Sequence, residues 1–215
     1  MDRSAVILAE NTQGKLGDGK ALWKLNDKPL LNHVVDAVKG ISGEVLVVAN
    51  SKEQADAYAK VVSSANVKFA VSDQSEGTLS VALKGFEAAQ GKYILLLPFN
   101  TPFVSKDVVS LLFDCCVGKS AVVPRWPDHK IEPLQAVYFT ELALMAAKEA
   151  LASGERNLDA MVCKLRGVRY LSTLVVEQLD PDFRSFFKVN SPLDLKKAVT
   201  IAKPKKPQKK PVNMR

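Results

Sequence analysis

The sequence predicts an α/β fold, a three-layer α/β/α arrangement around a mostly parallel central sheet. Short, unbroken apolar segments alternate with segments whose apolar residues recur at helical spacing, which is typical of parallel strands connected by helices. The apolar segments lack polar alternation, as expected of strands that are buried on both faces. Right-handed crossovers should bring the carboxyl ends of the strands to the same edge, where ligands bind in such sheets.

The first half of the chain contains four predicted strands and four predicted helices. The strands are expected at residues 5–9, 44–49, 67–71 and 93–98. The helices are expected at residues 29–38, 52–62, 78–89 and 106–116. Pro29 suits a first helical turn, and Ser105 suits the N-cap of the fourth helix.

The pattern changes after residue 120. Short apolar segments at 121–124 and 133–139, separated by a turn, predict an antiparallel excursion from the parallel sheet. The remaining predicted helices are 140–152, 157–165 and 192–202, and the remaining predicted strands are 168–173 and 186–189.

Length and charge indicate one globular domain with a basic tail. The chain has 215 residues and a net charge of +7. Residues 203–215 contain five lysines and one arginine, so without those six charges the body carries only +1. We therefore expect a single domain over 1–202 and a disordered tail over 203–215, with no primary nucleic-acid role. No apolar run approaches the roughly 20 residues of a membrane span, and a cytoplasmic location is expected.

Cysteine and histidine do not form a metal or nucleophile motif. Cys115 and Cys116 are adjacent in an apolar helical segment, where cysteine behaves as a small hydrophobic residue. Cys163 leaves the count odd, which argues against a disulfide framework. His33 and His129 are far apart in sequence, and His33 is interpreted as a structural helix residue.

The loop after the first predicted strand is rich in glycine and lysine. Gly14, Gly17 and Gly19 allow positive φ angles and close approach of the backbone to a ligand. Lys15 and Lys20 add positive charge to the same loop, and this combination suits a polyphosphate.

The spacing from Gly14 to Gly19 and Lys20 also fits a P-loop. However, Ala21 stands where a P-loop needs Ser or Thr to hold Mg²⁺, and residues 26–29 interrupt the long helix that should follow. A generic glycine loop of an α/β protein is a further possibility, and on the loop alone these interpretations stay open.

Four segments in order resemble the MobA-like nucleotidyltransferases, the molybdenum cofactor guanylyltransferases. The first runs from Leu-Ala at 8–9 through Lys-Leu-Gly at 15–17 and Lys20 to Lys-Pro-Leu at 28–30. The others are Leu-Pro-Phe-Asn-Thr-Pro-Phe at 97–103, Glu-Pro-Leu-Gln-Ala-Val-Tyr at 132–138 and Lys-Val-Asn-Ser-Pro-Leu-Asp-Leu at 188–195. Together they cover roughly residues 4–200 and make the P-loop spacing a coincidence.

The resemblance implies a Rossmann-like, GT-A-like nucleotidyltransferase fold and a reaction. A phosphate of molybdopterin would attack the α-phosphorus of GTP, forming the guanine dinucleotide cofactor and releasing pyrophosphate. Lys20 and Lys15 would be catalytic, and Asn100 and Asn190 would occupy the positions of Mg²⁺ ligands. The nucleotide-binding residues implied are Leu8, Ala9, Glu10, Asn11, Gly14, Gly17, Lys20, Asn50 and Asp73.

Three departures from the family pattern fall at positions that the chemistry uses. Glu10 and Asn11 replace paired glycines, Asn100 replaces the metal-binding aspartate, and Lys188 replaces the first asparagine of the last motif. Because a hard dication prefers carboxylates, Asn100 weakens the expectation of Mg²⁺. Two alternatives therefore stay open: a degenerate relative that binds nucleotide or cofactor precursor without catalysis, or a transferase with another phosphorylated acceptor. The protein is expected to be a monomer or homodimer.

Overall fold

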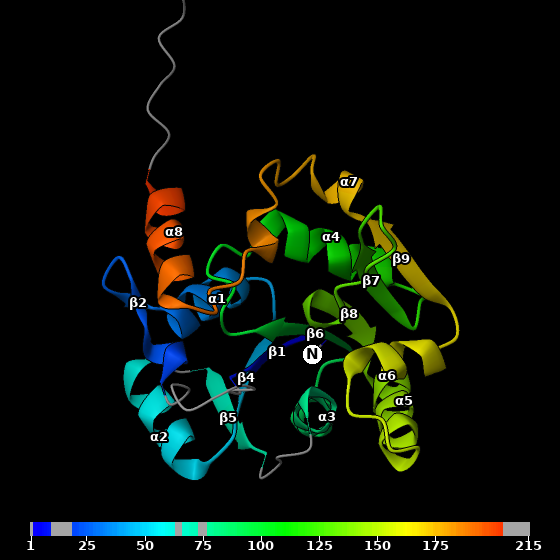
Figure 1. Cartoon of the computed structure of the whole chain (residues 1–215). Helices are drawn as coiled ribbons and strands as arrows, with labels where there is room; N and C mark the ends of the chain where they lie inside the picture. The colour runs from blue at the N-terminus through cyan, green and yellow to red at the C-terminus, as the bar shows by residue number, and fades with distance from the viewer. Residues whose placement is uncertain (1, 10–18, 63–65, 73–76, 204–215) are drawn as a thin grey trace, which may run out of the picture.

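The structure, a computed structural model, describes residues 2–9, 19–62, 66–72 and 77–203. Its centre is a seven-stranded sheet in the order β5-β4-β1-β6-β8-β7-β9 (Figure 1). The strands are β1 (Arg3–Leu8), β4 (Glu44–Ala49), β5 (Val67–Val71), β6 (Tyr93–Pro98), β7 (Ala121–Arg125), β8 (Ala136–Phe139) and β9 (Val168–Ser172). Within this sheet β8 runs antiparallel to both of its neighbours, β6 and β7, and the other pairs are parallel. The predicted sheet with its antiparallel excursion is confirmed.

Helices cover both faces of the sheet, which confirms the predicted three layers (Figure 1). One face packs against α1 (Leu30–Val38), α2 (Lys52–Val61), α4 (Lys106–Cys116) and the short α7 (Thr173–Val176). The other face packs against α3 (Thr78–Ala88), α5 (Thr140–Ala152) and α6 (Leu158–Lys164). Alternate residues of β1 and β4 point into the two cores, as expected of strands buried on both sides.

Helix α3 lies very close to the sheet because Gly85 has no side chain. A Cβ at this position would lie 2.4 Å from Cγ1 of Val6 and 3.3 Å from Cγ2 of Val48. The contact holds α3 against β1 and β4, the two strands that lead into the glycine and lysine loop and to Asn50.

The amino edge of the sheet is organised around the buried carboxylate of Glu44. It accepts hydrogen bonds from the Ser4 hydroxyl (2.7 Å), the Gln90 amide (2.9 Å) and the Lys68 ammonium (2.8 Å). The Ser4 hydroxyl in turn accepts a hydrogen bond from the amide of Gly91. One side chain therefore connects β1, β4 and β5 to the turn that precedes β6.

A small third hydrophobic core lies between a hairpin near the N-terminus and the last helix. The hairpin of β2 (Lys24–Leu25) and β3 (Lys28–Pro29) packs against α8 (Pro192–Ala202), with Leu25, Leu30, Val189 and Ala198 buried between them. Asn26 and Asp27 form the turn with φ angles of 50° and 61°, a conformation that these two residue types tolerate. His33 supports the hairpin, since its Nε2 lies 3.0 Å from the carbonyl oxygen of Leu25.

Three sequence predictions need correction. Residues 186–189 do not form a strand: a 3-10 helix, Arg184–Phe186, is followed by an irregular segment. The strand predicted at 133–139 begins at Ala136, because Pro133–Gln135 forms a 3-10 turn. Ser105 occupies the N-cap of α4, but its side chain makes no capping hydrogen bond.

The cysteines are free thiols, as the odd count suggested. Cys116 is buried in α4, and this burial raises the pKa of its thiol to about 12. No helix in the described part of the chain has the length and apolarity needed to cross a membrane.

We predict that Glu44→Ala lowers the free energy of unfolding by about 3 kcal/mol at pH 7, because it leaves the buried Ser4 hydroxyl and the part-buried Gln90 amide without their acceptor and removes the ion pair with the exposed Lys68. Burial raises the pKa of Glu44, but Lys68, the Gln90 amide and Ser4 outweigh it and lower the pKa below its ordinary value of 4.5. The stabilisation is therefore present above pH 4.5 and is lost as the pH falls through the folded-state pKa.

Urea unfolding of the wild type and Glu44→Ala at pH 7 and pH 3 measures this. The exposed Glu87, which pairs with Lys84 and Lys148, provides the control Glu87→Ala, with an expected change below about 1 kcal/mol. Equal losses for the two variants at pH 7 would contradict the role of Glu44.

Candidate active site

Four strands bring their carboxyl ends together at one edge of the sheet. The amide of Ala9 donates to the Val48 carbonyl (2.8 Å), and the amide of Phe99 donates to the Leu8 carbonyl (3.1 Å), so the chain segments leaving β1, β4 and β6 begin side by side. Leu8 and Ala9 are both buried. The amide of Ser72 donates to the Ala49 carbonyl (2.9 Å), which adds the end of β5 to the same edge.

Buried polar atoms without partners gather at this edge. Within the described residues, eight buried side-chain oxygens have no hydrogen-bond partner, and three of them follow the ends of β4, β5 and β6. They are Asn50 Oδ1, Ser72 Oγ and Asn100 Oδ1. A buried acceptor without a donor costs roughly 1–3 kcal/mol, so a bound ligand with N–H or O–H groups would stabilise this arrangement.

Asn100 and Asn190, the two predicted metal positions, are brought into contact. The Asn100 Nδ2 donates a hydrogen bond to Asn190 Oδ1 over 2.6 Å, although 90 residues separate them in the chain. Asn100 is buried at the end of β6, whereas Asn190 is exposed. The structure therefore places these two predicted residues in contact, and their role as metal ligands stays a prediction.

The segment that carries Asn190 crosses the carboxyl end of β6 and is held there. The amide of Val189 donates to the carbonyl of Asn100 over 2.8 Å. Asp194 accepts hydrogen bonds from the amide of Asn190 (3.2 Å) and from the hydroxyl of Ser191 (2.8 Å). The Ser191 contact is the largest cause of the lowered pKa of Asp194, which keeps this cap ionised. The start of α8 thus fixes where Asn190 lies.

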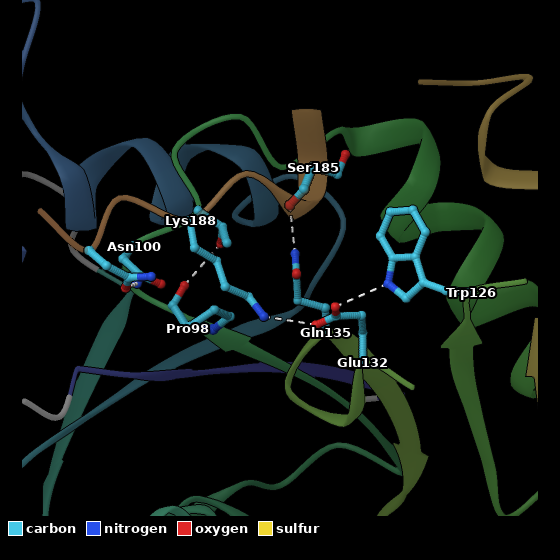
Figure 2. Close-up of polar contacts among 9 residues, drawn as sticks. Pro98, Asn100, Trp126, Glu132, Gln135, Ser185 and Lys188 are labelled. Atoms are coloured by element: carbon cyan, nitrogen blue, oxygen red, sulfur yellow. Dashed lines mark hydrogen bonds and ion pairs between the residues drawn. The ribbon is translucent and has the colours of Figure 1, made fainter. Parts of the chain in front are cut away.

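Lys188 reaches from this crossing segment to the buried carboxylate of Glu132 (Figure 2). The Lys188 Nζ lies 2.8 Å from Glu132 Oε2, and the Trp126 indole donates to Glu132 Oε1 over 3.1 Å. The Glu132 side chain is 9% exposed and that of Lys188 is 34% exposed. The carboxylate is therefore covered, while part of the lysine faces solvent.

Gln135 provides a second link between the same two parts of the chain. Its Nε2 donates to the carbonyl of Ser185 over 2.6 Å (Figure 2). The hydroxyl of Ser185 accepts from the amide of Ser105 over 3.1 Å. The turn before β8, the 3-10 helix before Lys188 and the start of α4 are thereby fixed relative to one another.

An aromatic pocket of about 470 Å³ adjoins the ion pair. Trp126 packs against Phe183 and Phe186, with ring centroids 5.2 and 5.3 Å apart. The pocket is lined by Trp126, Asp182, Phe183, Arg184, Phe186, Phe187 and Ile201. Two residues of the pocket lining connect it to the ion pair. Trp126 donates a hydrogen bond to Glu132, and Phe187 directly precedes Lys188 in the chain.

Lys20 is half-buried at the start of the 3-10 helix Lys20–Leu22. Gly19, directly before it, has a φ angle of +110°, which confirms the expected positive φ at this glycine. Only three residues are helical before the chain turns into β2, so the long helix that a P-loop requires does not begin at this lysine.

Several predicted nucleotide-binding residues lie outside the described part of the chain. These are Glu10, Asn11, Gly14, Gly17 and Asp73, and the predicted catalytic residue Lys15 lies outside it as well. For Leu8, Ala9, Asn50 and Lys20, the structure gives positions on or beside the carboxyl edge of β1 and β4, and contact with a nucleotide stays a prediction.

The described residues do not form a charged site for Mg²⁺. Over residues 2–9, 19–62, 66–72 and 77–203, no three His, Cys, Asp or Glu side chains gather where they could hold a metal ion. Asn100 and Asn190 are neutral, and the Asn190 oxygen already accepts a hydrogen bond from Asn100. Mg²⁺ prefers carboxylates and substrate phosphates, so a cation arriving with a nucleotide would gain little binding energy from this amide pair.

Sequence reasoning missed Ser72 and the Glu132–Lys188 pair as parts of the site. Ser72 ends a predicted strand, and its position beside Asp73 was the available signal. The ion pair joins residues 56 positions apart and leaves no local pattern.

Comparison with known proteins identifies relatives over nearly the whole chain. A family model described as the MobA-like NTP transferase domain matches residues 5–168. A probable molybdenum cofactor guanylyltransferase of Methanosarcina mazei is 26% identical over 208 residues, covering 94% of this chain and 92% of the relative. A molybdenum cofactor guanylyltransferase of Desulfosudis oleivorans is 27% identical over 201 residues, covering 93% and 96%.

Solved structures show the same fold. Molybdopterin-guanine dinucleotide biosynthesis protein A from Archaeoglobus fulgidus aligns with a TM-score of 0.76 and 22% identity, covering 93% of this chain and 97% of that one. A 4-diphosphocytidyl-2C-methyl-D-erythritol synthase from Anaerococcus prevotii aligns with a TM-score of 0.72 and 14% identity, covering 93% and 95%.

We predict that Asn100→Asp creates a divalent cation site. A carboxylate at this position adds the missing negative charge next to the Asn190 oxygen, and Mn²⁺ should bind at least about tenfold more tightly than to the wild type. Calorimetric titration with Mn²⁺ measures the affinity, and Asn100→Leu, which removes the amide without adding charge, is the control. Equal Mn²⁺ affinity in the wild type and Asn100→Asp would show that the charge of this residue does not limit cation binding.

Proposed function

Because this chain belongs to the MobA-like NTP transferase domain family and is a nucleotidyltransferase, we propose that it transfers GMP from GTP to a phosphate of molybdopterin. The phosphate oxygen of molybdopterin forms a bond to the α-phosphorus of GTP, and the bond from that phosphorus to the β-phosphate bridging oxygen breaks. The products are the guanine dinucleotide cofactor and pyrophosphate.

The observation that supports this proposal best is the cluster of unpartnered acceptors at the ends of β4, β5 and β6. Asn50 Oδ1, Ser72 Oγ and Asn100 Oδ1 are buried where an α/β sheet binds its ligands. A guanine base offers N–H donors and a ribose offers hydroxyl donors, so a nucleoside placed along this edge would satisfy groups that the protein leaves unpaired.

The proposed chemistry requires orientation and charge neutralisation rather than a covalent intermediate. Phosphoryl and nucleotidyl transfer are accelerated mainly by aligning the attacking and leaving oxygens and by stabilising charge on the phosphate. We assign this role to Lys20 from the described part of the chain and to Lys15 from the loop before it. Mg²⁺ is expected to arrive bound to the triphosphate.

The relatives' names support molybdopterin as the acceptor. The pocket beside Trp126 fits this assignment, because a planar heterocycle packs well on aromatic rings.

We predict that the protein binds GTP more tightly than ATP or CTP, and more tightly with Mg²⁺ than with EDTA. Lys20→Ala should weaken GTP binding about tenfold or more, since a charge-assisted hydrogen bond to phosphate contributes roughly 1.5–3 kcal/mol. Isothermal titration calorimetry with the three nucleotides measures both effects. Lys24→Ala, at an exposed position on β2, is the matched control and should leave the affinity unchanged.

A guanylyl-transfer assay with molybdopterin completes the test. GTP binding without formation of pyrophosphate would favour a binding protein that has lost catalysis, and turnover with a different phosphorylated acceptor would correct the substrate. No affinity for any of the three nucleotides would refute the proposed function.

A further inference from the structure

The Glu132–Lys188 ion pair joins a covered carboxylate to a lysine side chain that is partly exposed. Glu132 is enclosed by two donors, the Lys188 ammonium at 2.8 Å and the Trp126 indole at 3.1 Å, and 9% of its side chain is exposed. Lys188 is 34% exposed. An ammonium has three donors, and Glu132 Oε2 accepts one of them. Among the described residues no second hydrogen bond of the Lys188 ammonium is formed, so two donors can bind a ligand.

The position of Lys188 places this cation at the ligand edge of the sheet. The two residues that follow it in the chain are both fixed to Asn100, Val189 through its amide (2.8 Å) and Asn190 through its side chain (2.6 Å). Figure 2 shows the Lys188 side chain running from the vicinity of Asn100 past Pro98, the last residue of β6, to Glu132. The ammonium therefore lies between the end of β6 and the aromatic pocket that Trp126 and Phe187 line.

On the pocket side, the charged residues Arg184 and Asp182 pair with each other at 2.7 Å. On the side of the sheet edge, the described polar side chains near the ends of β4, β5 and β6 are uncharged. Asn50, Ser72, Asn100 and Asn190 are neutral, and Gln135, which binds the Ser185 carbonyl, is neutral as well. A doubly charged phosphate entering this edge would meet amides, hydroxyls, Lys20 and the Lys188 ammonium that Glu132 holds in place. Anion binding by a preorganised cation needs no rearrangement of that cation when the ligand arrives.

We propose that Lys188 is a phosphate-binding residue of this site, that Glu132 is the residue that positions it, and that its fixed charge serves where the described residues form no cluster of metal-binding side chains. The ligand chemistry is a phosphate group. The proposed function, on which the identity of the ligand rests, supplies two sources: the triphosphate of GTP and the phosphate of the acceptor.

The test compares variants that remove the Lys188 charge with one that keeps it. Lys188→Met removes the ammonium but leaves Glu132 buried without its partner, so the double variant Glu132→Gln with Lys188→Met is included to keep the cluster neutral and folded. Lys188→Arg retains the charge. Lys164, which pairs with Glu149 at 3.0 Å and is 26% exposed, provides the matched control Lys164→Met. Thermal unfolding confirms that each variant is folded.

Pyrophosphate and GTP are titrated into each protein by calorimetry in EDTA, and KM for molybdopterin is measured with Mg²⁺. We expect both methionine-containing Lys188 variants to weaken phosphate binding by about tenfold or more, Lys188→Arg to restore most of it, and Lys164→Met to match the wild type. Weaker GTP and pyrophosphate binding identifies the triphosphate as the source, and a raised KM for molybdopterin alone identifies the acceptor.

Unchanged affinity for GTP and pyrophosphate together with unchanged KM for molybdopterin in the double variant would overturn the proposal. Failure of the wild type to bind GTP with Mg²⁺ is a separate result that refutes the proposed function, and the pyrophosphate titration still tests Lys188 in that case.

Discussion

The register of β1 between β4 and β6 is the constraint on which the rest of the molecule depends. Parallel strands bind ligands at one edge only if their carboxyl ends are level, and here Leu8 pairs with both Val48 and Pro98. The alignment is set at the opposite edge, where the Glu44 carboxylate holds Ser4 and the turn before β6 together. A buried carboxylate at one end of the sheet thus determines which side chains meet at the other.

This register also explains how distant segments form one site. The loop after β6 presents the carbonyl and carboxamide of Asn100 to the C-terminal segment, which uses them in place of a strand partner. The hairpin at residues 24–29 and helix α8 bury Val189 between them, so the segment has a fixed path across the sheet edge. The site is therefore assembled by packing outside the main sheet as well as by the sheet itself.

The parallel sheet could be predicted from sequence because each buried strand is a continuous apolar run ended by a polar residue. The predicted bounds of β4, β5, β6 and α4 agree with the structure. The prediction of a strand at 186–189 failed because its apolar residues are buried in the small third core and beside the pocket, while its backbone bonds to the loop after β6. The apolar pattern of a short segment predicts that the segment is buried, but it does not predict which neighbouring element packs against it.

The same reasoning applies to the site. Asn100 and Asn190 could be proposed as site residues because each stands in a recognisable motif. Lys188 could be recognised as a departure from the last motif, but the sequence could not predict that it pairs with Glu132. Its partner, Glu132, is a buried carboxylate that stabilises the fold only when a cation accompanies it. Lys188 pairs with this carboxylate and at the same time places its positive charge near the carboxyl edge of the sheet. One side chain can therefore both stabilise the buried Glu132 and bind a phosphate.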